Sequence, residues 1–400
     1  MSSSKIRSRR RGNEDWLWKG VNSHQLIGAI EYTTLEPDSS LVSSASKPEL
    51  LCTYDWQDRP NPTVLVPGNA PAWTDQQLPI TIPEDHGVYF VDQNAARLPE
   101  YPLEPIFHAT ASMNPSFRFD DVDVVVNRNT LRKLFEFGKN SFVESFRVNL
   151  YIVKNTLFIE RCSQITTERV RQNGGYGRTF EKQFTKSTNK STGHHRVLRY
   201  HLGMLNCVVR FEVDASYQEN QSEQVGDLSN GSLATAIEGL NLESSKRGDT
   251  EAFSPKFLES SRLKSIFTAE EATPQSKAAE IKTFTEKRGL RRHLRIPQLW
   301  FGRTHWLIAG RHNNGTFDGI DVSYVKPEEF IDWEIQFQEP LRKMVTVIAQ
   351  LRDIVEKNKG FHCVAIFEQK ERPKVIKVYA SSSPGKKPLP TSLIKHFWAS

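Results

Sequence analysis

The sequence predicts an α+β fold with mixed, largely antiparallel sheets and flanking helices. Three observations lead to this class. Runs of β-branched residues bounded by turn signals indicate strands, as in "VDVVVN" at residues 122–127. Two such runs around a short turn indicate a hairpin, as in "SFRVNLYIVKNTLFIERC" at residues 145–162. One long run has apolar residues at helical spacing, and it reads "LRKMVTVIAQLRDIVEKN" at residues 341–358.

The composition of the 400-residue chain is that of a globular protein, because 38% apolar residues are enough for one large core. Its four cysteines are scattered without a CxxC pair, which argues against a disulfide framework or a structural zinc site. The chain contains neither a run of 18 apolar residues nor a secretory signal. We therefore expect an intracellular protein, nuclear or cytoplasmic, without a membrane partner. The net charge of +6 suits an ordinary solvated surface and equally a nucleic-acid partner.

The first half of the chain divides into a tail and the start of a domain. Residues 1–50 are Ser-rich and charged, so we expect a disordered basic tail there and a single domain over residues 51–400. Proline-rich irregular chain is expected up to residue 118. The sequence then predicts, in order, a strand at 122–127, a helix at 129–138, the hairpin at 145–162, a helix at 178–184 and a strand pair at 195–216.

The second half begins with a polar segment. Residues 216–277 are rich in Ser, Glu, Asn and Gln with few aromatic residues, and we expect a disordered insertion that interrupts a sheet. After it the sequence predicts a strand at 279–284, a helix near 298–301, a hairpin at 305–325, the amphipathic helix at 341–358, a strand pair at 361–380 and a C-terminal helix.

Charged residues at a spacing of two occur in two of these strands. Glu212 and Asp214 end one strand, and Glu280 and Lys282 lie in another. Side chains two apart in a strand share a face, so two such strands side by side would converge three carboxylates and a lysine. Their repulsion would favour a divalent cation, and all-oxygen ligands favour Mg²⁺ or Mn²⁺. We therefore expect a metal-dependent hydrolase site, in which neutralising Glu280 relieves repulsion.

Either pair taken alone is more often a solvated strand end. A second acid-x-Lys pattern, Glu368 and Lys370, has no acidic pair upstream of it and is interpreted as part of a turn. His194 and His195 follow several lysines, so they are interpreted as part of an exposed basic loop, with phosphate contact as the alternative.

The motifs, taken in order, resemble those of the DXO-like decapping exonucleases, whose fungal members accompany the nuclear 5′→3′ exoribonuclease. The resemblance covers residues 122–380 and rests on five short segments: "VNRNTLRKL", "GYGRTFEKQF", "FEVDA", "EIK" and "QLWFGRTHWLIAGR". It implies a DXO-like nuclease fold. It also implies direct Mg²⁺ or Mn²⁺ ligands and residues that contact the substrate.

The resemblance assigns a role to each matched residue. The direct metal ligands would be Glu181, Asp214, Glu280 and the carbonyl of Ile281. Glu212 would act through a bound water. Lys282 and Gln298 would position the nucleophilic water and the scissile phosphate, and Arg128 would meet the RNA 5′ end.

The chain departs from the family pattern near the expected 5′ end. Asn127 and Asn129 flank Arg128 where the family often has Trp and Gly, and Arg178 replaces an aromatic residue. The chain looks closer still to divergent fungal relatives, some of which are labelled geranylgeranyl pyrophosphate synthetase. That chemistry needs two DDxxD motifs on facing helices, whereas "FDDVDVVV" contains none and leads into a strand. We therefore disfavour a prenyl diphosphate synthase.

The resemblance implies hydrolysis at the 5′ end of RNA: removal of an incomplete or non-canonical cap, release of pyrophosphate, or stepwise 5′→3′ cleavage. The expected partners are RNA with an altered 5′ end and a 5′→3′ exoribonuclease. Two alternatives remain. One is a non-catalytic RNA-binding or scaffold relative of the same fold, and the other is an unrelated DNA endonuclease of the acid-x-Lys type.

Overall fold

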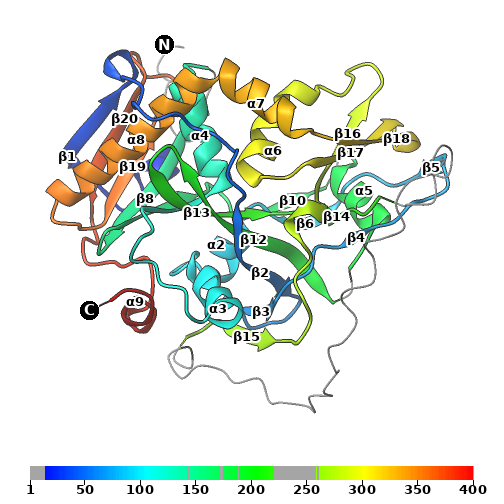
Figure 1. Cartoon of the computed structure of the whole chain (residues 1–400), viewed down its shortest axis with the longest axis horizontal. Coiled ribbons are helices and arrows are strands. Elements are labelled where there is room, and N and C mark those ends of the chain that lie inside the picture. The colour runs from blue at the N-terminus through cyan, green and yellow to red at the C-terminus, as the bar shows by residue number, and fades with distance from the viewer. Residues whose placement is uncertain are drawn as a thin grey trace, which may run out of the picture.

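A large mixed sheet forms the centre of the protein (Figure 1). The computed structural model describes residues 14–141, 144–171, 174–187, 189–219, 258 and 261–399. Within them the large sheet has eleven strands, in the spatial order β1 (Val21–Glu31), β20 (Val375–Ser381), β19 (Cys363–Phe367), β8 (Phe146–Val153), β9 (Thr156–Cys162), β7 (Val124–Asn127), β13 (Leu205–Glu212), β12 (Ser191–Leu202), β2 (Glu49–Gln57), β3 (Thr63–Val66) and β15 (Lys264–Phe267).

A second sheet of seven strands lies beside it, in the order β11 (Thr185–Lys186), β4 (Ala72–Trp73), β14 (Ala215–Ser216), β16 (Ala278–Thr285), β17 (Trp306–Asn313), β18 (Thr316–Tyr324) and β5 (Ile80–Thr81). A two-stranded sheet pairs β10 (Thr167–Val170) with β6 (Gly87–Phe90). Most neighbours are antiparallel, but β7 runs parallel to both β9 and β13, β15 to β3, β16 to β17 and β14 to β4. The predicted mixed, largely antiparallel α+β class is therefore confirmed.

Helices cover the sheets. The α-helices are α2 (Gln93–Arg97), α3 (Glu104–Met113), α4 (Arg128–Gly138), α5 (Gly177–Phe184), α6 (Ile296–Gly302), α7 (Pro327–Gln336), α8 (Gln338–Lys357) and α9 (Thr391–Phe397). The 3-10 helices are η1 (Asp15–Trp18), η2 (Tyr32–Thr34), η5 (Gln275–Lys277) and η6 (Arg292–Leu294). No helix in these described parts of the chain is long and apolar enough to cross a membrane.

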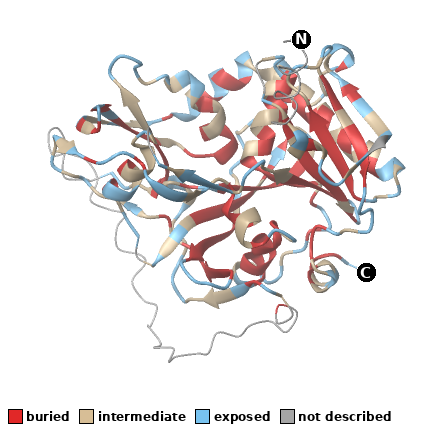
Figure 2. Cartoon of the chain, turned by 180° about the vertical axis from the view of Figure 1, so that it is seen from behind, coloured by how far each residue is buried: buried red, intermediate tan, exposed pale blue. Residues whose placement is uncertain are grey.

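The large sheet is buried on both faces (Figure 2). Its strands alternate between two cores, as β7 illustrates. Val124 and Val126 pack with α4 and α8, whereas Val125 packs on the opposite face with α3 and α9. A run of valines on a strand covered from both sides explains why the sequence there is continuously apolar rather than alternating.

The smaller sheet has its own core. Phe180 and Phe184 of α5 pack with Ile281, Ile308 and Phe317 of the sheet. The ring centroid of Phe180 lies 4.3 Å from that of Phe184 and 4.4 Å from that of Phe317. This packing fixes helix α5, and therefore Glu181, against strand β16.

The N-terminal segment and the polar segment at 216–277 differ in part from what the sequence predicts. Residues 14–50 are not a disordered tail, because they include η1, β1 and η2, and β1 pairs antiparallel with β20. The apolar residues of β1 gain their partner from the far end of the chain, which the local composition does not reveal. Of the expected insertion at 216–277, residues 220–257 lie outside the described residues, whereas residues 261–277 are ordered and contain β15 and η5.

The aromatic packing beneath α5 gives a first prediction. Phe180→Ala removes a fully buried ring, so we expect the free energy of unfolding to fall by about 3–5 kcal/mol in urea titrations. Phe361→Ala is a matched control, because this ring is 47% exposed, and its loss should cost less than about 1 kcal/mol. Equal losses in the two variants would contradict the described core.

Candidate active site

Acidic residues gather where the chain passes from the large sheet to the smaller one. Glu212 is the last residue of β13 in the large sheet, and β14 of the smaller sheet begins three residues later. Ala215 of β14 pairs with Ala279 of β16, which brings Asp214 beside the expected metal strand. The Asp214 Oδ2 atom accepts a hydrogen bond of 2.8 Å from the backbone N–H of Ile281.

Glu280 lies at the centre of this junction. Its side chain is 1% exposed, and it points to the same side as Lys282, while Ile281 is buried in the core under α5. The alternation predicted from the sequence is therefore confirmed. The Glu280 carboxylate accepts hydrogen bonds from Arg128 at the start of α4 and from Gln298 on α6. Burial favours the neutral acid, but Arg128 and Lys282 outweigh it, and the pKa of Glu280 is lowered.

The Lys282 ammonium occupies the space between the acids. Its Nζ atom lies 3.3 Å from Asp214 Oδ2, 3.2 Å from Glu280 Oε2 and 2.7 Å from the carbonyl oxygen of Ile281. Burial disfavours its charge, but the two nearby carboxylates reverse that effect and raise the pKa of Lys282. Three groups expected as metal ligands thus converge on one cation, the lysine itself.

For the remaining two acids, Lys282 and Arg128 offset the effects of burial and of neighbouring carboxylates only in part. Burial and the charge of Asp214 raise the pKa of Glu181 well above its usual value, and its carboxylate has no hydrogen bond or ion pair with the described residues. Burial of the carboxyl group and Asp214 also raise the pKa of Glu212, although its side chain remains open to solvent on one side. Among the described residues, Arg128 and Lys282 are the cations that form ion pairs with these four carboxylates, so negative charge is in excess when all four are ionised.

This donor set fits a divalent cation chemically. It is composed of carboxylates and one carbonyl, the oxygen ligands that Mg²⁺ and Mn²⁺ prefer, and it carries an excess of negative charge. In the described parts of the chain, however, no group of three Asp, Glu, His or Cys side chains is already arranged around a metal position. Because Lys282 contacts the same oxygens, a cation would have to displace it.

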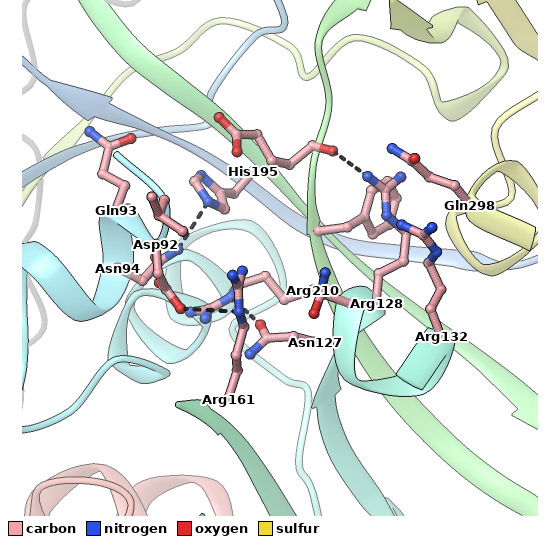
Figure 3. A pocket seen from close by; sticks show the side chains of 14 residues that line it. Asp92, Gln93, Asn94, Asn127, Arg128, Arg132, Arg161, His195, Arg210 and Gln298 are labelled. Carbon is pink, nitrogen blue, oxygen red and sulfur yellow. Dashed lines mark hydrogen bonds and ion pairs between the residues drawn. The ribbon is translucent and has the colours of Figure 1, made fainter. Parts of the chain in front are cut away.

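A polar pocket of about 190 Å³ adjoins the acids (Figure 3). Arg128, Glu212 and Gln298 belong to its lining, so it opens directly onto the site. Figure 3 shows Arg128, Arg132 and Gln298 on one side and Asp92, Gln93 and Asn94 on the other, with Arg161 and Arg210 between the two groups. We call this the arginine pocket.

The sequence reasoning missed most of the arginine pocket. A sequence signal for Arg132 was available, because it lies four residues after Arg128 and helical spacing puts both on one face of α4. A similar signal was available for Arg210, because it lies two residues before Glu212 and strand spacing puts both on one face of β13. The contribution of Arg161 depends on the neighbouring order of β9, β7 and β13, for which the sequence carries no local signal.

The expectation for the two histidines is wrong. His194 and His195 lie within β12, and each is 5% exposed or less rather than part of an exposed loop. His194 Nδ1 lies 2.7 Å from Asp55 Oδ1, and the His195 ring stacks on Tyr54 with a centroid separation of 5.0 Å. Strand β12 is an interior strand between β2 and β13, and its two histidines meet Asp55 of β2 and Asn94 of α2, partners that the polar residues around them in the sequence do not reveal.

The chain belongs to the family described as "Domain of unknown function (DUF8563)", whose sequence model matches residues 24–398. No curated protein matches it in sequence. The fold is similar to the crystal structure of S. pombe Rai1, with a TM-score of 0.53 at 10% identity over 88% of this chain and 98% of that chain.

Two further Rai1 structures are similar. Scheffersomyces stipitis Rai1 in complex with (3′-NADP)⁺ and calcium ion gives a TM-score of 0.56 at 11% identity over 91% of this chain and 98% of that chain. Candida albicans Rai1 in complex with pU5-Mn²⁺ gives a TM-score of 0.53 at 11% identity, over 92% of this chain and 98% of that chain. These likenesses confirm the expected fold, and at such low identity they leave the roles of individual residues open.

The charge balance of the site gives a second prediction. Glu280→Gln breaks a buried ion pair with Arg128, so in the presence of a chelator we expect the free energy of unfolding to fall by about 3 kcal/mol. This corrects the expectation that neutralising Glu280 relieves repulsion, since the structure shows the carboxylate paired with two cations. Glu181→Gln should leave the stability unchanged or raise it, because its charged form has no partner.

Urea titrations of both variants at pH 7 measure this difference, with Glu368→Gln as a control outside the site. If both site variants lost stability equally, the excess charge would not lie where the structure places it.

Proposed function

We propose that this protein is a Mg²⁺- or Mn²⁺-dependent hydrolase that acts on RNA 5′ ends. The observation that carries the proposal is the convergence of Asp214, Glu280 and Lys282 at the junction of two sheets, with Arg128 and Gln298 directly beside them. The reactions considered are removal of an incomplete or non-canonical cap, release of pyrophosphate and stepwise 5′→3′ cleavage. The similarity to Rai1 structures that hold 3′-FADP, (3′-NADP)⁺ or pU5 supports a nucleotide substrate.

Each residue has a role that its position supports. A divalent cation held by Glu181, Asp214, Glu280 and the Ile281 carbonyl, with Glu212 acting through water, would acidify a bound water and stabilise the leaving oxygen. Lys282 offers a buried ammonium that can orient the attacking water and the scissile phosphate. Gln298 donates through its amide at the same place, and Arg128 retains donors on the side that lines the arginine pocket.

A second candidate is a non-catalytic RNA-binding or scaffold protein with the same fold. It is favoured by one observation: Lys282 already neutralises Asp214 and Glu280, and the described acids do not form a ready metal cluster. A DNA endonuclease of the acid-x-Lys type is less favoured, because the shared fold covers about nine-tenths of the chain. A 5′→3′ exoribonuclease remains a proposed partner, and a nuclear or cytoplasmic location is proposed with it.

The decisive experiment compares four RNAs of one sequence, with a 5′-triphosphate, an unmethylated cap, an NAD cap or a 5′-monophosphate. Each is incubated with the protein, with and without Mn²⁺. We expect Mn²⁺-dependent hydrolysis of at least one of them. Binding of RNA without hydrolysis of any would favour the scaffold candidate.

Lys282 provides a third prediction, which separates chemistry from metal binding. In Lys282→Ala we expect hydrolysis to fall at least about a hundredfold, because a donor to the reacting groups is lost. The rise in melting temperature caused by millimolar Mn²⁺ should persist or grow, because the ammonium no longer competes for the acids. Lys370→Ala should change neither readout. Loss of the Mn²⁺ effect in Lys282→Ala would contradict the assigned role.

A further inference from the structure

We propose that a basic loop at residues 286–295 binds the backbone of the RNA downstream of its 5′ end, so that the affinity of the protein for RNA rises with RNA length. The loop joins β16 to α6 and includes η6 (Figure 1). None of its residues belongs to the lining of the arginine pocket. This inference rests on the proposed function and assigns a separate surface to the body of the same substrate.

A large share of the net charge of the chain lies in this loop. Its ten residues read "EKRGLRRHLR", with five Lys or Arg residues against one Glu, a net charge of +4 where the whole chain has +6. Such clusters bind phosphodiester backbones whatever the base sequence, because each phosphate that meets a Lys or Arg releases a condensed counterion. A guanidinium group also matches two phosphate oxygens in geometry. The composition of the loop therefore suits a nucleic-acid backbone.

Contacts to the rest of the fold give the loop a fixed shape. Gly289 has a φ of +60°, and its N–H donates to the carbonyl of Thr285 at 3.0 Å, which closes a turn after β16. Leu290 packs against the core that contains α4 and α8. Arg292 donates to Glu329 at 3.0 Å, which ties the loop to α7. The loop thus presents its other cations in a defined arrangement, which lowers the entropic cost of binding a ligand.

The other four cations of the loop have no counter-ion. Lys287, Arg288 and Arg291 are exposed, and their side chains form no hydrogen bond or ion pair within the described parts of the chain. Arg295 is half-buried, and its Nε atom is buried without a hydrogen-bond partner among the same residues. A buried N–H that lacks an acceptor costs free energy, and an incoming phosphate oxygen would remove that cost.

Both ends of the loop lie close to the candidate active site. Lys282 lies four residues before the loop on β16, and Gln298 lies three residues after it on α6. Burial, followed by the charges of Arg128 and Arg295, lowers the pKa of Arg132, so the last arginine of the loop lies near the lining of the arginine pocket. An RNA with its 5′ end at the acids would therefore pass along the loop with the nucleotides that follow.

A half-exposed ring beside the loop favours RNA over other polyanions. Arg292 donates to the carbonyl oxygen of Tyr324 at 3.4 Å, and Tyr324 is 42% exposed. His305 stacks on this ring with a centroid separation of 5.1 Å, and Trp306 meets it edge-on at 4.9 Å. Aromatic rings next to phosphate-binding cations are typical of surfaces for single-stranded nucleic acids, because any base can stack on them. We therefore expect single-stranded RNA as the ligand rather than an anionic membrane surface.

The test measures binding in the presence of a chelator, so that no metal-dependent hydrolysis interferes. Fluorescence anisotropy compares 3′-labelled pUpU with a 3′-labelled oligouridylate of about twelve nucleotides at several salt concentrations. In the triple variant Lys287→Gln, Arg288→Gln and Arg291→Gln, we expect the affinity for the longer RNA to fall at least about tenfold at low salt. Its plot of log K against log salt should become shallower by about 2, at roughly 0.7 for each lost phosphate contact. The affinity for pUpU should stay unchanged, because pUpU is too short to reach these residues.

The matched control is the triple variant Lys357→Gln, Lys359→Gln and Lys395→Gln, which removes the same charge from exposed positions near the ends of α8 and α9. It should leave both affinities and the salt dependence unchanged, and both triple variants should keep the melting temperature of the wild type. An equal loss of affinity in the two triple variants would show that the net charge alone matters, and would overturn the inference.

Equal affinity of the wild type for the two RNAs would also overturn it, as would binding of phosphatidylserine vesicles in place of RNA. Binding in the chelator keeps this result separate from the proposed function. If no RNA is hydrolysed but the loop variant loses affinity for the longer RNA, the proposed hydrolase is wrong and the RNA surface stands. If RNA is hydrolysed but the loop variant binds both RNAs as the wild type does, the assignment of the loop alone is wrong.

Discussion

The convergence of four carboxylates at the junction of two sheets, around the fully buried Glu280, is the constraint on which the rest of the site depends. Buried like charges are costly unless cations or hydrogen-bond donors face them. Here the donors come from separate elements: Arg128 from α4, Lys282 from β16 and Gln298 from α6. Helices α4 and α6 pack together in a core of the large sheet, whereas β16 packs in the core of the smaller sheet, so the positions of the donors are set by two separate cores. The excess of negative charge that remains is the feature that distinguishes this junction from a structural ion-pair network.

The sequence predicted those parts of the site that depend on local periodicity. The strand period placed Glu280 and Lys282 on one face and Ile281 in the core, and the structure agrees. The arrangement of the expected ligands could not be predicted from the sequence, because Lys282 lies between the acids only when β14 pairs with β16. The arginine pocket was missed for a similar reason. Its lining comes mainly from four neighbouring strands and three helices, whose arrangement is a tertiary property.

The N-terminal strand β1 shows that the fold, too, could be predicted only in part from the sequence. A Ser-rich segment with a short apolar run resembles a tail when read alone, yet β1 is an edge strand whose partner β20 lies some 350 residues later. The long helix α8 was predictable because its whole apolar stripe lies within one segment, from Leu341 to Val355. Contacts between distant segments, rather than composition, decide which short apolar runs join the sheet.

The fold is shared with Rai1 at 10–11% identity, so the backbone arrangement persists where most side chains differ. A shared fold does not determine a shared reaction, which depends on the residues of the site. Two adjoining regions of opposite charge meet at Arg128 and Glu212, with acids on one side and arginines on the other.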